Sequence, residues 1–378
     1  MSEASVGSIS AHFAQVVDPR VERTKHHQLL DILTIAICAV ICGADDWVEV
    51  EQFGNDKLEW LQTFLTLPNG IPSHDTFGDV FARIDPDEFE RGFQSWVQTI
   101  AKLLPAEVIP IDGKRLRRSH NHTLGKHAIH MVSAWASSQQ LVLGQVKVDE
   151  KSNEITAIPA LLQMLSVKGC IVSIDAMGCQ SDIAARIIAQ QADYMLALKG
   201  NQGHLLDDVR DLFTTARAEQ FKDVAHDYVK TTDKDHGRIE TRRCWTICEP
   251  SELAYIRDLK DWAQLRSVVM LEAIRRIGQT TTTEIRYYIS SLTPTAQQAL
   301  GIIRSHWSIE NELHWVLDVA FREDDSRVRI GYGAQNLAVL RHLALNLLKR
   351  ETSVKIGIKA KRHKAGWSIP YLQKVLSH

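Results

Sequence analysis

The sequence predicts a mixed α/β protein that begins with a small all-α domain and carries a β-rich insertion. Apolar residues recur every three or four positions in the first hundred residues, which is typical of packed helices. After Pro105, short β-like runs alternate with helical stretches, and strand patterns dominate residues 207–292. The chain has 378 residues, of which 44% are hydrophobic, so we expect a globular protein of two or three domains.

Residues 1–104 are predicted to form the helical domain. Turn signals, PNG at 68–70 and IPS at 71–73, interrupt its helical pattern. The longest apolar run, residues 29–42, contains Asp31 and is shorter than the roughly 20 residues that cross a bilayer, so we expect a buried helix and no membrane contact. The start, MSEASVGSIS, does not resemble a secretory signal peptide.

Residues 105–206 are predicted to form the first part of the core. The runs VIPID, AIHMVSAWAS and LVLGQVKV are spaced like three antiparallel strands. A helix at 155–165, the strand CIVSID, a helix at 181–191 and the strand YMLAL follow. Three strands followed by alternating helices and strands indicate a mixed sheet of the ribonuclease H kind.

The remainder of the chain is predicted to hold the β-rich insertion, residues 207–292, and the second part of the core, residues 293–378. The clearest strands of the insertion are RRCWTIC, SVVMLEAIRRI and TEIRYYISSL. One long helix is expected over 295–320 and a second over 333–350. The chain then ends in a basic tail that contains Lys355, Lys359, Lys361, Arg362 and Lys364.

Two aspartates, Asp112 and Asp175, each end an apolar predicted strand. A run buried on both faces belongs to the centre of a sheet, and a carboxylate at its end can lie in an open crevice. Either Asp alone could equally be a helix cap or a turn residue. Two such aspartates in one mixed sheet favour a shared site.

A third acid, Glu310, lies beside the apolar stripe of a predicted helix, with His306 and His314 one turn to either side. Glu310 could also be an ordinary solvated helix charge. The aromatic residues around it, Trp307 and Trp315, favour a functional role, although we expect both indoles to pack in the core.

Three converging carboxylates would supply hard oxygen ligands, which suit two Mg²⁺ ions, and Mn²⁺ could substitute. Two ions about 4 Å apart can activate a water or a DNA 3′-hydroxyl and stabilise the leaving oxygen of an in-line phosphoryl transfer. The same site could therefore cleave a DNA strand and then join its 3′-end to a target.

The motifs VIPIDGKRLR, VSIDAMGCQ, LALKGNQG and HWSIENELHWVLDVAFREDDSRVR closely resemble those of the H-repeat-associated insertion-sequence transposases. The segments DILTIAICAVICGADDWVEVEQFG and GIPSHDTFGDVF resemble that family's transposase-associated domain. The resemblance implies a ribonuclease H-like domain with a DDE triad at Asp112, Asp175 and Glu310. It also implies double-stranded DNA partners, namely the terminal inverted repeats and a target, with the N-terminal domain binding ends or mediating assembly. Because two ends are cut in one complex, we expect a homodimer or a larger assembly on DNA.

Several basic and aromatic residues are candidate DNA contacts. Four follow the first Asp directly and could meet a backbone over the metal site, although they could also belong to a solvated hairpin: Lys114, Arg115, Arg117 and Arg118. Lys199 ends a strand and could bind a phosphate. Trp245, in the insertion, could stack on an unpaired base at the cut end.

In the wider group of bacterial cut-and-paste transposases, the helix that carries the Glu has a Tyr, an Arg and a Lys that handle DNA phosphates. At the same distances from Glu310, this chain has Ile303, His306 and Leu317 in place of the Tyr, the Arg and the Lys. His306 could still contact a phosphate, whereas Ile303 and Leu317 could not. The candidates to compensate are Arg304, His314 and Arg327. The acidic run at 323–325 is expected to be a solvated face, although Asp324 could assist the metals.

Charge, cysteine content and histidine spacing bear on the expected partner, the cellular location and the metal. The net charge of −2 argues weakly against a nucleic-acid partner, so local clusters must supply the basic surface. The six cysteines lack paired CxxC spacing and are expected to be reduced, in a cytoplasmic, nucleoid-associated protein. The irregular spacing of four histidines favours surface or core positions over a zinc site: His120, His122, His127 and His130.

Two rival functions remain beside the transposase. One is a metal-dependent DNA nuclease without strand transfer, and the other is a DNA-binding regulator whose catalytic site has decayed. The presence of all three acids weighs against decay.

Overall fold

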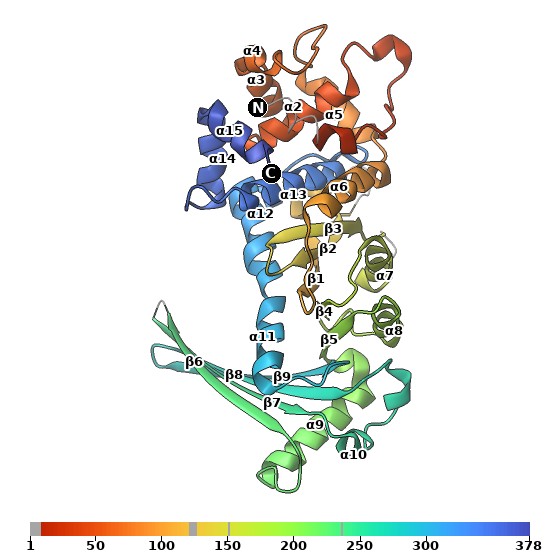
Figure 1. Ribbon diagram of the computed structural model, residues 1–378, viewed down its shortest axis with the longest axis vertical. Helices are drawn as coiled ribbons and strands as arrows, with labels where there is room; N and C mark the ends of the chain where they lie inside the picture. The colour runs from red at the N-terminus through yellow and green to blue at the C-terminus, as the bar shows by residue number, and fades with distance from the viewer. Residues whose placement is uncertain (1–8, 121–126, 150–151, 236) are drawn as a thin grey trace.

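The computed structural model describes residues 9–120, 127–149, 152–235 and 237–378. Helices from both ends of the chain gather at one end of an elongated molecule, the central sheet lies in the middle, and long curved strands that continue this sheet form the other end (Figure 1). The long helical segment that begins with α11 (Ala296–His306) runs alongside the sheet and connects the two ends.

The N-terminal region is helical, as predicted. After a short 3-10 turn, η1 (Glu22–Thr24), come α2 (Leu29–Ile41), α3 (Trp47–Asp56), α4 (Leu58–Leu61), α5 (His74–Arg83) and α6 (Pro86–Ile100). Polar side chains start three of them: Asp46 caps α3, Ser73 caps α5, and Asp85 caps α6. Helix α2 is buried from Asp31 to Ile41, which confirms the buried helix expected there.

The central sheet has the strand order β3-β2-β1-β4-β5. Its strands are β1 (Val108–Arg115), β2 (His130–Ala136), β3 (Leu141–Lys147), β4 (Ile171–Ile174) and β5 (Asp193–Leu198). The first three pair antiparallel, whereas β1, β4 and β5 pair parallel, which is the ribonuclease H-like arrangement that the sequence predicts. Helices α7 (Glu154–Met164) and α8 (Ser181–Ala189) lie on one side of this sheet and α11 lies on the other (Figure 1).

The insertion extends the central sheet instead of forming a sheet of its own. It contains α9 (Gly203–Ala218), β6 (Asp227–Asp235), β7 (Arg238–Ile247), α10 (Pro250–Leu253), η5 (Leu259–Asp261), β8 (Ser267–Ile277) and β9 (Thr280–Ser290). Strand β9 pairs antiparallel with β5, from Met195 opposite Ser290 to Leu198 opposite Tyr287. A single sheet of nine strands therefore runs from β3 to β6.

The single helix expected over 295–320 is divided into three parts. Helix α11 is followed by a π-helical segment, η6 (Ile309–His314), and by α12 (Trp315–Phe321), which leads into a 3-10 turn, η7 (Glu323–Asp325). Helix α13 (Gly333–Arg350) then confirms the second predicted helix.

The prediction of a basic C-terminal tail is wrong, because residues 358–376 fold into α14 (Ile358–Trp367) and α15 (Ile369–Leu376). Two of the five basic residues are buried and satisfy backbone carbonyls. The Lys361 ammonium lies 2.8 Å from the Leu348 carbonyl oxygen, and Arg362 donates to the Val40 carbonyl at 3.0 Å. Lys361 thus ties α14 to the end of α13, Arg362 ties it to α2, and neither charge is available to a ligand.

Helix α13 joins the N-terminal helices to the sheet. It contacts α2, α5, α6 and β3, and most of its residues are buried. Asn336 donates to the carbonyls of Phe81 and Ile84, at 2.9 and 3.0 Å, and Asn346 exchanges two hydrogen bonds with the backbone of Val142. One hydrophobic cluster consequently includes residues of both regions. Within the residues described, no helix is long and apolar enough to span a bilayer.

Candidate active site

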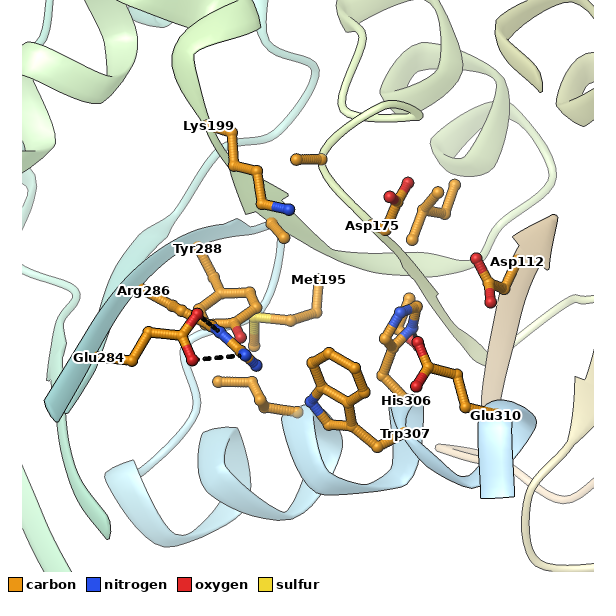
Figure 2. Close-up of a pocket in the computed structure, with 15 residues that line it drawn as sticks. Asp112, Asp175, Met195, Lys199, Glu284, Arg286, Tyr288, His306, Trp307 and Glu310 are labelled. Carbon is orange, nitrogen blue, oxygen red and sulfur yellow. Dashed lines mark hydrogen bonds and ion pairs between the residues drawn. The ribbon is translucent and has the colours of Figure 1, made fainter. Parts of the chain in front are cut away.

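A pocket of about 180 Å³ lies where the core sheet, the insertion and the α11–η6 helical segment meet (Figure 2). Its polar lining combines acidic and basic side chains: Asp112, Ser173, Asp175, Lys199, Glu284, Arg286, Tyr288, His306 and Glu310. Residues about 200 positions apart in the sequence thus face one cavity.

Asp112 and Asp175 lie side by side on neighbouring parallel strands. The last paired residues of β1 and β4 are Ile111 and Ile174, so each Asp follows directly after the pairing ends. Strand β1 continues to Arg115 because it still pairs with β2, and Asp112 is therefore inside the strand and not at its end as expected. One carboxylate oxygen of Asp175 accepts a hydrogen bond from the Met177 N–H at 3.1 Å, so this residue also forms a turn.

Glu310 reaches the same pocket from the π-helical segment η6. In Figure 2 its carboxylate lies below that of Asp112, with His306 beside it. The three acids that the sequence singles out therefore line one pocket. Wider helical turns of this kind are rare and occur frequently at functional sites.

Burial raises the pKa of two of these acids, and neighbouring negative charge adds to the effect. Burial raises the pKa of Asp112 to about 7, and the nearby charges of Asp175, Glu154 and Glu310 contribute to the increase. Burial also raises the pKa of Glu310, Arg286 opposes this, and Asp175 adds to it. A cation between these carboxylates would offset the repulsion.

His306 and His314 flank the acids and contact protein groups. The His306 Nδ1 lies 3.1 Å from the hydroxyl of Ser173, two residues before Asp175. The His314 Nδ1 lies 3.5 Å from a carboxylate oxygen of Asp112. Burial lowers the pKa of His314 to about 3, so its ring is neutral. With 12% of its side chain exposed, His314 supports Asp112 and has little surface to offer DNA.

Two cations occupy the opposite side of the pocket (Figure 2). Lys199 follows β5 and directs its ammonium into the pocket. Arg286, on β9, is held by Glu284 through contacts of 2.7 and 2.8 Å and stacks over the ring of Trp307, 4.7 Å from its centroid. Neither Arg286 nor Glu284 is predicted from the sequence, because the pattern of their strand indicates only β-structure.

Lys114 does not take the DNA-binding position expected of it. Its ammonium lies 2.5 Å from a carboxylate oxygen of Asp318 and 2.6 Å from one of Glu323, and 11% of its side chain is exposed. Glu323 is buried, so the expectation of a solvated acidic face is wrong at this residue. Behind the acidic pocket, Lys114 therefore acts as a buried counter-ion.

The other three basic residues of this segment are exposed, and two of them have acidic partners. Arg115 is exposed at the end of β1. Arg117 pairs with Asp324 at 3.1 Å and Arg118 with Asp325 at 3.4 Å. Since Asp324 faces Arg117 and is absent from the lining of the pocket described here, it does not join the three acids.

Arg304 and Arg327 lie in two different hollows. Arg304 lines a groove that continues from the acidic pocket. Arg327 lines a separate hollow between α3, α5 and the segment 322–330. Of these two candidates, Arg304 is the one near the acids.

The three tryptophans also differ from expectation. Trp245 is 8% exposed and packs against Phe221 and the Arg217 guanidinium, on the face of β7 that carries odd-numbered residues. It does not line the acidic pocket, so its position does not support base stacking. The expectation that Trp307 and Trp315 pack in the core is wrong, because Trp307 lines the pocket and Trp315 is 61% exposed.

The histidine-rich segment offers no metal site among the described residues. His122 lies outside them. His130 contacts Glu154 at 2.8 Å, and Glu154, at the start of α7, is a fourth acid close to Asp112 that the sequence analysis missed. Over the described ranges, no group of three or more His, Cys, Asp or Glu side chains is arranged as a ready metal site, and that includes the three acids as they stand.

The strand order and the mixed pairing place this chain in the ribonuclease H-like class of proteins. Two family models match it: the one described as "DDE_Tnp_1-associated" over residues 10–97, and the one described as "Transposase DDE domain" over residues 104–347. The chain belongs to the DDE transposase family.

Relatives cover nearly the whole chain. "Putative transposase YncI" of Escherichia coli O157:H7 is 41% identical over 376 residues, which is 99% of this chain and 95% of the relative. "H repeat-associated putative transposase YhhI" of Escherichia coli strain K12 is 40% identical over 371 residues, 97% of each chain. A solved structure, the piggyBac transposase synaptic complex with hairpin DNA, has a TM-score of 0.42 and 11% identity, and covers 100% of this chain and 79% of that one. At that level the likeness supports no statement about function.

Proposed function

We propose that this transposase cleaves DNA at the ends of its insertion sequence and joins the released 3′-ends to target DNA. The observation that carries the proposal is the gathering of Asp112, Asp175 and Glu310 around one pocket from two strands and a helix. The family membership supports DNA as the substrate.

The same three carboxylates are the proposed ligands of divalent metal ions. Their donor set consists of hard oxygens, which Mg²⁺ prefers and Mn²⁺ accepts. The side chains would turn toward a common point on binding, since they are not arranged as a ready site. When bound, two ions would supply the activation of the attacking oxygen and the stabilisation of the leaving one.

Other residues of the pocket would orient the DNA. Lys199 and Arg286 are placed to hold phosphate oxygens on the side opposite the acids. His314 contacts Asp112, and His306 contacts Ser173 close to Asp175. The N-terminal helices would bind the inverted repeats or bring two copies together, so that both ends are cut in one assembly.

The proposal is tested by incubating the protein and Mg²⁺ with labelled DNA that carries the inverted repeats. We expect end cleavage and a joined product. Asp175→Asn and Glu310→Gln should each lower both by about a thousand-fold or more, because the metal ligands act as a unit. Glu312→Gln, on the same helical segment, is the matched control and should retain activity.

Each outcome of this assay decides between the candidate functions. Cleavage without joining would identify a nuclease. Binding without either product, unchanged by Asp175→Asn, would identify a regulator with an inactive site. A fully active Glu310→Gln protein would show that Glu310 does not belong to the triad.

A further inference from the structure

A groove of about 570 Å³ continues from the acidic pocket along one face of β7, β8 and β9. It shares Glu284, Arg286, Ile303, Trp307 and Glu310 with that pocket, so the two hollows are continuous. Five of the residues that line it are arginines: Arg238, Arg242, Arg275, Arg286 and Arg304.

Strand register explains why the arginines share one face. Side chains two apart on a strand point the same way. Arg238 and Arg242 lie on β7, Arg275 on β8 and Arg286 on β9. Arg275 is directly opposite Glu240 of β7, and Arg286 is directly opposite Leu271 of β8, so all four arginine side chains leave the same face of the sheet. Arg304 adds a fifth guanidinium from α11.

The arginines outnumber the carboxylates that hold them. Glu240 contacts Arg238 at 2.9 Å and Arg275 at 3.0 Å, and it also pairs with Arg242. A second carboxylate, Asp233, lies 2.7 Å from Arg242 and 3.6 Å from Arg304. Glu284 also holds Arg286, so among the described residues three acids hold five guanidiniums in place, and with Glu310 counted the groove keeps a small excess of positive charge.

Stability alone does not account for this arrangement. The side chains of Arg238, Arg275 and Arg304 are 46%, 56% and 53% exposed, and exposed ion pairs contribute little to folding. A chain with a net charge of −2 nevertheless gathers five of its 44 Lys and Arg residues on one face beside the acidic pocket. Such a concentration is what a polyanion requires.

The remaining lining favours a single strand over a duplex. Leu271 and Ala273 give the groove an apolar floor, and the indole of Trp307 lies at the end nearest the acids. Grooves that bind unpaired nucleic acid combine cations along the backbone with apolar and aromatic surfaces for the bases. From Leu271 to Arg275 the floor extends roughly 13 Å along β8, which is long enough for a short stretch of single-stranded DNA.

We propose that this arginine groove binds the sugar-phosphate backbone of an unpaired DNA strand that continues from the phosphate held in the acidic pocket. The inference rests on the proposed function and adds to it the form of DNA that leaves the active site. The insertion thus guides one strand, while the core performs the chemistry.

The test compares two fluorescent DNA probes in EDTA, where no cleavage occurs: a blunt duplex of the element end, and the same duplex with a short unpaired flank. We expect the full-length protein to bind the flanked probe about ten-fold more tightly, and the double variant Arg238→Glu/Arg275→Glu to lose that preference while it binds the blunt probe as before. For the flanked probe, the slope of log affinity against log salt should become shallower by about 1.4 in the double variant. Two phosphate contacts are lost, and each contact to a single strand contributes about 0.7.

Arg276→Glu is the matched control, because this residue is adjacent on β8 and points to the opposite face. The inference is overturned if the double variant keeps the flank preference, if its binding to the blunt duplex falls equally, or if Arg276→Glu has the same effect. Failure of the proposed function is distinguishable from failure of this inference. Wild-type protein that prefers the flanked probe but does not cleave DNA in Mg²⁺ would contradict the proposed cleavage and still support DNA binding in the groove.

Discussion

Lys114 neutralises two carboxylates directly behind the acidic pocket. It contacts both Asp318 and Glu323, and Glu323 lies 3.7 Å from Arg341, which is also buried. Lys114 and Asp112 are two apart on β1, so both side chains leave the same face of the strand. This buried group of charges therefore lies next to Asp112 on that face of β1.

We predict that Lys114→Met destabilises the protein by about 3 kcal/mol or more. The substitution leaves the Glu323 carboxylate buried with a weakened set of partners, and breaking a buried ion pair from one side costs several kcal/mol. Urea unfolding followed by circular dichroism measures the change. Arg115→Met, one residue on and exposed, should remain within about 0.5 kcal/mol of wild type, and equal stability of the two variants would contradict the prediction.

Single residues could be predicted where local sequence determines their place. Asp112 and Asp175 follow apolar runs that become adjacent parallel strands, so their proximity follows from the pattern. Glu154 and Arg286 could not be found in this way, because their approach to Asp112 and Glu310 depends on how distant elements pack. Lys114 was misassigned, since the sequence does not show that Asp318 and Glu323 return to it.

At the scale of elements, the π-helical segment η6 determines how Glu310 is presented. It separates α11, which packs on the sheet, from α12, which contacts α14. A π-helical turn contains an extra residue relative to an α-helical one. Glu310 and His306 therefore have a different angular relation to His314 and Leu317 than an uninterrupted helix would give.

Deletion of Asn311 should lower cleavage by about a hundred-fold or more. Asn311 is exposed, and its removal would let the segment become α-helical and rotate Glu310 by about 100° relative to Leu313 and Leu317. The cleavage assay measures the effect, with circular dichroism to establish folding. Asn311→Ala keeps the residue count and should retain activity; a folded deletion variant that cleaves within about ten-fold of wild type would refute the role of η6.

Most elements of the core could be predicted from the sequence, because each carries a clear period and a turn at its ends. Strands β1 to β5 and helices α7 and α8 lie within a few residues of the predicted ranges. Strand β6 was not singled out, since it is largely exposed and polar, with the sequence DYVKTTDKD. Helix α14 is hard to recognise in the sequence because it is strongly basic and has no clear apolar face, and α15 is only eight residues long.

At the scale of the whole molecule, the N-terminal helices share their core with the end of the chain. Helix α13 contacts α2, α5 and α6, while α14 contacts α2. The sequence alone suggests a separate helical domain, since periodicity within 1–104 says nothing about a helix that arrives from residues 333–350. The pairing of β5 with β9 cannot be predicted for the same reason, because local periodicity does not show which distant strands pair.

We predict that the isolated fragment 1–104 does not unfold cooperatively. It lacks the apolar face of α13 and the Asn336 side chain that satisfies the carbonyls of Phe81 and Ile84. Thermal unfolding by circular dichroism should give a broad change, and mixing with the fragment 105–378 should restore a sharp transition. A sharp transition in the fragment alone would show that the helices form an independent domain.

The shared core also has a consequence for synthesis on the ribosome. The N-terminal helices emerge first, yet α13 begins roughly 230 residues after α6 ends, a delay on the order of tens of seconds at about 5 to 20 residues per second. During that interval the apolar faces of α2 and α5 lack α13 to pack against, so they are accessible to chaperones and proteases. A product truncated before residue 333 would remain in that state, so completion of the chain is itself a condition for folding of its first hundred residues.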